Sequence, residues 1–81
     1  MKEEQITDLI LRILGQIAPE ADLKNLRAEK RFRDQFQFDS VDFLNFAQTL
    51  QEELARRIPE EDFPSLSTLE GCINYLSSKA P

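Results

Sequence analysis

The chain has 81 residues, of which 41% are hydrophobic and 31% charged, and its net charge is −5. These values indicate one small globular domain over residues 1–81 and disfavour nucleic acid or anionic membrane as partners. Since the chain has no histidine and only one cysteine, Cys72, catalytic triads with histidine, histidine-ligated metal sites and an intrachain disulfide are excluded.

The N-terminal segment predicts a helix rather than a leader. Its start, Met1-Lys2-Glu3-Glu4, is not a signal peptide, and no apolar run approaches membrane-spanning length, so we expect a cytoplasmic protein without membrane insertion. Apolar residues then recur every three or four positions, which predicts an amphipathic helix over residues 3–17. They are Ile6, Leu9, Ile10, Ile13, Leu14 and Ile17. Ala18-Pro19 ends this helix, because proline restricts the residue before it.

Residues 20–38 show weaker periodicity and form a long connection, of a length that is usually functional or packed by its own side chains. Five apolar residues are expected to tie this loop to the core: Leu23, Leu26, Phe32, Phe36 and Phe38. The stretch from Lys24 to Arg33 is basic. Its two interpretations are a solvated loop surface and a contact site for an acidic partner.

The chain is organised around the run from Phe38 to Leu44, where the loop turns into a helix. Asp39 is the expected N-cap, since its carboxylate can accept backbone N–H bonds from the first turn. Ser40 then occupies the first helical position, beside the positive end of the helix dipole, where a phosphate ester is electrostatically favoured. An ordinary helix start explains the Asp-Ser pair as well.

The helix expected over residues 40–55 has a core face and a second apolar patch. The core face is expected to comprise Phe43, Phe46, Ala47, Leu50 and Leu54. Val41 and Leu44 fall on a different side, among acidic and amide side chains, which suits transient docking to a basic surface. An ordinary solvated face with a wide apolar stripe is the alternative.

Two further helices complete the chain. Pro59 followed by three acidic residues predicts a short third helix that Pro64 stops. Ser67-Thr68-Leu69-Glu70 is a capping box that opens a last helix to about Ser77. The residues expected to face inward from this helix are Leu69, Cys72, Ile73 and Leu76.

In this order the elements resemble the acyl carrier protein family over nearly the whole chain. The run Asp39-Ser40-Val41-Asp42 is similar to the family's Asp-Ser-Leu-Asp attachment motif, and Phe32 and Phe36 stand where the family keeps apolar residues in its long first loop. Three later runs resemble the acidic helix end, the Ile-Pro-acidic turn and the final helix start: residues 50–54, 58–61 and 67–69. The resemblance implies an all-α, four-helix acyl-carrier-like bundle with a long first loop and a short third helix.

The resemblance also implies a carrier rather than an enzyme, with no catalytic residue and no metal site. A phosphopantetheinyl transferase, which uses coenzyme A and Mg²⁺, would modify Ser40, and the phosphopantetheine arm would hold acyl groups as thioesters. The implied protein is a monomer that serves acyl-loading and acyl-processing enzymes with basic docking surfaces in fatty-acid, polyketide or related lipid biosynthesis. The residues expected at the attachment site or against partners, besides Ser40, are Asp39, Val41, Asp42, Leu44, Glu52, Ile58 and Glu61.

Several positions depart from the family pattern and suggest a specialised carrier with dedicated partners, since they make the docking face less acidic. They are Gln37 and Phe38 in place of small residues, Val41 for leucine, Asn45 for glutamate, Gln48 for an apolar residue and Gln51 for an acid.

Bulky residues are candidates for lining a slot between helices that shelters part of an acyl chain, although each also fits ordinary core packing. They are Phe36, Phe43, Phe46 and Phe63. The alternative function is a helical interaction module with an unmodified Ser40. A small enzyme is disfavoured, because no pair of carboxylates stands out from the acidic surface for acid–base chemistry.

Overall fold

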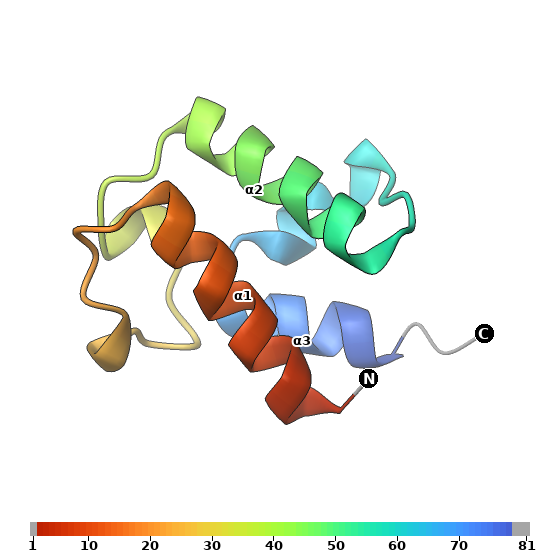
Figure 1. The fold of residues 1–81 in the computed structure, drawn as a ribbon, viewed down its shortest axis with the longest axis horizontal. Helices are drawn as coiled ribbons and strands as arrows, with labels where there is room; N and C mark the ends of the chain where they lie inside the picture. Colours follow the sequence, from red (N-terminus) through yellow and green to blue (C-terminus); the bar gives the residue numbers. More distant parts are fainter. Residues whose placement is uncertain (1, 79–81) are drawn as a thin grey trace.

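The computed structural model describes residues 2–78, which fold into helices joined by loops (Figure 1). In chain order the elements are α1 (Glu3–Ile17), η1 (Leu23–Asn25), η2 (Phe32–Asp34), α2 (Ser40–Leu54), η3 (Glu60–Leu66) and α3 (Leu69–Ser78), where η denotes a 3₁₀ helix. The four longer elements, α1, α2, η3 and α3, form the expected all-α bundle with a long first loop and a short third helix. The predicted boundaries of α1 and α2 are confirmed to within one residue.

Helix α1 packs against both α2 and α3, and it runs between them in the view of Figure 1. Its predicted apolar stripe is confirmed, since five of its residues are buried: Ile6, Leu9, Ile10, Ile13 and Leu14. Burying each of these side chains contributes about 1.5–3 kcal/mol relative to leaving it exposed. Ala18 caps the C-terminal end of the helix, and its N–H donates to the Leu14 carbonyl oxygen at 2.8 Å.

The long loop between α1 and α2 is anchored by the buried ring of Phe32 and by the side-chain amide of Gln35. Phe32 is fully buried, and its N–H donates to the Ser67 carbonyl oxygen at 3.0 Å. The Gln35 side chain accepts a hydrogen bond from the Arg27 N–H at 2.7 Å and donates to the carbonyl oxygens of Arg27 and Lys30, both at 2.9 Å. The expected anchoring of the loop is confirmed, because further apolar side chains pack against the core: Leu23, Leu26, Phe36 and Phe38.

The third helix differs from the prediction in where it ends. Pro64 does not stop it, since η3 continues through Pro64 to Leu66. A proline removes one backbone donor, and a short 3₁₀ helix loses less from this than an α-helix that must keep a regular i→i−4 ladder.

The cap of the last helix is Thr68 rather than Ser67. The Gly71 N–H donates to Thr68 Oγ1 at 2.8 Å, whereas the Ser67 hydroxyl donates to the Pro64 carbonyl oxygen at 2.9 Å. Ser67 ends η3 in the helical region of backbone space, with φ −79° and ψ −13°, so it cannot take the extended conformation that an N-cap requires.

Gly71 allows α3 to approach η3 closely. A Cβ atom at this position would lie 2.2 Å from the Ser65 carbonyl oxygen and 2.9 Å from Thr68 Oγ1. The same two elements are joined by the Tyr75 hydroxyl, which donates to Asp62 Oδ2 at 2.7 Å. Glycine is therefore required here by close backbone contact rather than by an unusual φ angle.

We predict opposite effects for alanine at the two glycines of the chain. Gly71→Ala should lower the free energy of unfolding by about 1–3 kcal/mol, because the new methyl group meets backbone that must move. Gly15→Ala is the matched control: its Cβ would lie 3.6 Å from Leu23 Cδ1, an ordinary contact, and alanine is favoured in helices by about 0.5–1 kcal/mol. Urea unfolding measures both, and a Gly71→Ala variant as stable as the parent would contradict the close approach.

Candidate functional site

The start of α2 is fixed by two aspartates that cap each other. The Asp42 N–H donates to Asp39 Oδ1 at 2.9 Å, and the Asp39 N–H donates to Asp42 Oδ2 at 3.2 Å. The predicted role of Asp39 as N-cap is confirmed. The return bond from Asp42 was not predicted, although an acidic residue three positions after the cap is its sequence signature. The pair holds the loop-to-helix turn in one geometry.

Ser40 is the first residue of α2, and its side chain is exposed. Within residues 2–78 its hydroxyl has no hydrogen-bond partner, so the oxygen is available to an incoming reagent. Because the capping pair fixes the backbone on either side of it, this hydroxyl stands on a rigid element rather than on a mobile loop.

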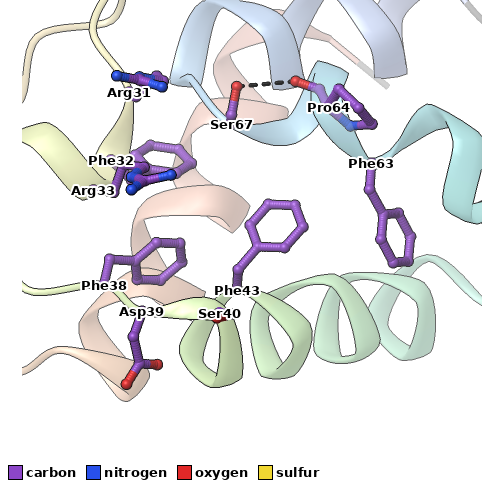
Figure 2. A pocket seen from close by; sticks show the side chains of 10 residues that line it. All are labelled: Arg31, Phe32, Arg33, Phe38, Asp39, Ser40, Phe43, Phe63, Pro64 and Ser67. Carbon is purple, nitrogen blue, oxygen red and sulfur yellow. Dashed lines mark hydrogen bonds between the residues drawn. The ribbon is translucent and has the colours of Figure 1, made fainter.

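A cavity of about 580 Å³ opens beside Ser40, between the start of α2 and the segment around η3 (Figure 2). We call it the Ser40 cleft; its lining residues are Arg31, Phe32, Arg33, Phe38, Asp39, Ser40, Phe43, Phe63, Pro64 and Ser67. Figure 2 shows the rings of Phe38 and Phe43 directed into the cleft and the Asp39 carboxylate directed away from it.

The predicted slot lining is partly corrected. Phe43 and Phe63 line the Ser40 cleft as expected, but Phe46 is fully buried in the core and Phe36 lines a neighbouring hollow. Phe43 and Phe46 are neighbours on α2 with ring centroids 6.3 Å apart, but Phe46 is the one that is completely covered, and only Phe43 reaches the cleft.

The six phenylalanines of the chain form one continuous network of ring contacts. Phe38 contacts four other rings, with centroid distances of 5.4 Å to Phe36, 5.7 Å to Phe32, 6.1 Å to Phe46 and 6.4 Å to Phe43. Such offset and edge-to-face pairs add about 0.5–1.5 kcal/mol each beyond burial of area. Phe38, which replaces a small residue of the family pattern, therefore acts as the link between the loop and α2.

The predicted apolar patch on α2 is exposed. Val41 and Leu44 retain 64% and 54% of their accessible surface, and they are the large apolar side chains that remain exposed within residues 2–78. Glu52, on the same helix, and Glu61, on η3, are also exposed, whereas Asp42 is half-buried by its capping role.

The prediction that Ile58 contributes to a partner surface is wrong. Its side chain is 2% exposed and belongs to the hydrophobic core, because the chain between α2 and η3 turns this residue inward.

The interpretation of Gln51 as a position where the docking face lacks an acid is also incorrect. It is half-buried, its side-chain N–H donates to the Ala47 carbonyl oxygen at 3.1 Å, and its Oε1 accepts from the Ile58 N–H at 2.8 Å. The amide fastens the turn after α2, a role that needs both a donor and an acceptor. This departure from the family pattern is therefore structural.

The single thiol of the chain is not a reactive group. Cys72 is buried, and its Sγ contacts the Leu66 carbonyl oxygen at 3.4 Å. Burial raises the pKa of this thiol to about 12. Since the thiolate is the nucleophilic form, Cys72 is inert at neutral pH, and its predicted role as a small core residue is confirmed.

Residues 2–78 bring no three histidine, cysteine, aspartate or glutamate side chains together in a way that could hold a metal ion. None of their helices is both long and apolar enough to cross a membrane.

The family model described as "Phosphopantetheine attachment site" matches residues 4–76. The match spans α1 through most of α3, and it includes Ser40, the capping aspartates and the residues of the Ser40 cleft.

Proposed function

Because the chain belongs to the acyl carrier protein family, whose members carry a covalently attached phosphopantetheine, we propose that Ser40 holds this group and delivers acyl thioesters to partner enzymes. The observation that carries the proposal is the family match over residues 4–76, within which Ser40 presents an exposed hydroxyl without a hydrogen-bond partner in the described chain. When bound, phosphopantetheine supplies a terminal thiol that holds acyl groups as thioesters.

The residues around Ser40 fit this group. The mutual caps of Asp39 and Asp42 hold the attachment point still, and the Ser40 cleft offers apolar rings beside it. Cys72 is buried, so the thiol chemistry comes from the arm. Carrier domains are not catalytic themselves, and the enzymes that load and process the acyl group supply the remaining chemistry.

For the partner surface we propose Val41 and Leu44 as the contact centre, with an acidic rim of Asp39, Asp42, Glu52 and Glu61. The exposed apolar pair gives a partner area to bury, and the acids favour encounter with a basic surface. The partners in this proposal are a phosphopantetheinyl transferase and the acyl-loading and acyl-processing enzymes of fatty-acid, polyketide or related lipid biosynthesis. We place the protein in the cytoplasm as a monomer.

We also propose that this carrier has dedicated partners. Asn45 is exposed on α2 and uncharged where the family pattern has a glutamate, so the face carries less charge than that pattern, whereas Gln51 has a structural role and does not count toward the difference. We expect a ketosynthase of general fatty-acid synthesis to process the acylated protein at least about tenfold more slowly than its own carrier, a loss of about 1.4 kcal/mol. Equal rates with the two carriers would contradict the proposal.

The attachment proposal predicts a gain of mass and of one reactive thiol. After incubation with coenzyme A, Mg²⁺ and a broad-specificity phosphopantetheinyl transferase, the parent should gain the mass of one phosphopantetheine, and Ser40→Ala should gain none. Thiol titration of the native protein should rise from none to one, because Cys72 is buried and does not react.

Ser40→Ala should keep its helical circular dichroism, since the Ser40 side chain is exposed. A well-folded parent that stays unmodified would favour the alternative, an interaction module with a free Ser40.

The docking proposal predicts that Leu44→Arg slows modification. It should lower the rate of loading by the transferase about tenfold, because it places a cation in the proposed contact centre. Gln16→Arg is the control, since it adds the same charge at an exposed position on α1. Equal loading of the two variants would argue against Leu44 as a contact, and a large loss of thermal stability in Leu44→Arg would argue for a core role.

A further inference from the structure

One of the two arginine side chains that line the Ser40 cleft makes no contact that stabilises the fold. Arg31 and Arg33 both line the cleft, and Figure 2 draws them at the end opposite Phe63. Arg31 is held by Asp34, with 3.0 Å between Nε and Oδ2. The guanidinium of Arg33 has no ion pair and no hydrogen bond within the described residues 2–78.

The backbone of the loop around Arg33 has a fixed conformation. Arg33 is the middle residue of η2, whose first residue, Phe32, is buried and contacts three other phenylalanine rings. The Gln35 amide closes the same loop through its bonds to Arg27 and Lys30. The side chain of Arg33 is exposed, but its backbone is fixed beside the cleft.

The charges of the cleft favour an anion, although the chain as a whole carries −5. The one acidic residue in the lining is Asp39, whose carboxylate points away from the cavity in Figure 2 and accepts the Asp42 N–H. The remaining charged lining groups are the two guanidinium groups. A guanidinium offers parallel N–H donors that match the oxygens of a phosphate.

We propose that Arg33 binds the phosphodiester that joins the arm to Ser40. This inference rests on the proposed function, which puts that anion on the Ser40 oxygen, in the lining of the same cleft. Arg31 supports the site with a second, already paired cation. The contact would hold the first part of the arm over the phenylalanine rings in the free protein, and a partner that draws out the arm must break it.

The test uses the loaded protein and two charge-matched variants. Arg33→Gln removes the proposed contact. Arg57→Gln makes the same chemical change at an exposed arginine without a partner within residues 2–78, beyond the opposite end of α2 from Ser40. Intact-mass measurement first establishes that all three proteins are fully loaded. The ³¹P NMR resonance of the single phosphorus is then measured in each protein. In the unsubstituted parent, the Nε–Hε resonance of Arg33 is compared before and after loading.

We expect loading to shift the Arg33 Nε–Hε resonance of the parent. The ³¹P resonance should be displaced in Arg33→Gln and coincide with that of the parent in Arg57→Gln. Added salt should move the parent's ³¹P resonance toward that of Arg33→Gln, because an exposed ion pair is screened.

Coincident ³¹P resonances in all three loaded proteins, with an unmoved Arg33 resonance, would overturn the inference and leave the carrier function intact. Failure of the parent to load would overturn the proposed function and this inference with it.

Discussion

The burial of Phe32 is the constraint on which the rest of the molecule depends. Its ring contacts Phe36, Phe38 and Phe46, and its N–H reaches the Ser67 carbonyl oxygen, so one residue ties the long loop to α2 and to the start of α3. The loop is polar and has weak helical periodicity, and this buried ring and the Gln35 hydrogen bonds hold its path. Arg33 follows Phe32 directly in η2, and the Phe38 ring packs against Phe32 just before the capping turn.

The residues that stabilise the fold are largely different from those at the proposed attachment site. The core supplies stability through α1, the ring network and the close approach at Gly71, and none of these needs the Ser40 hydroxyl. The capping aspartates serve both purposes, because they end the loop and fix the proposed attachment point. In the proposed function, the chain contributes position and surface, and the arm contributes the reactive group.

The sequence predicts those features that depend on local pattern. The stripe of α1, the N-cap at Asp39 and the exposure of Val41 and Leu44 follow from spacing alone. The errors come from tertiary context. Ser67 resembles the N-cap of the last helix, but it is the C-cap of η3 and has a helical backbone conformation. Ile58 resembles a surface residue, but its side chain turns into the core. The place of Arg33 beside Ser40 could not be predicted either, since it depends on how Phe32 and Gln35 fold the loop.

The measurement that tests the central claim most directly is peptide mass spectrometry of the loaded protein, which assigns the added group to one residue. The account predicts phosphopantetheine on Ser40, within the peptide that carries the Asp39–Asp42 turn, and on no other serine or threonine. An added group on a different residue, or a loaded protein whose Ser40 peptide is unmodified, would contradict it.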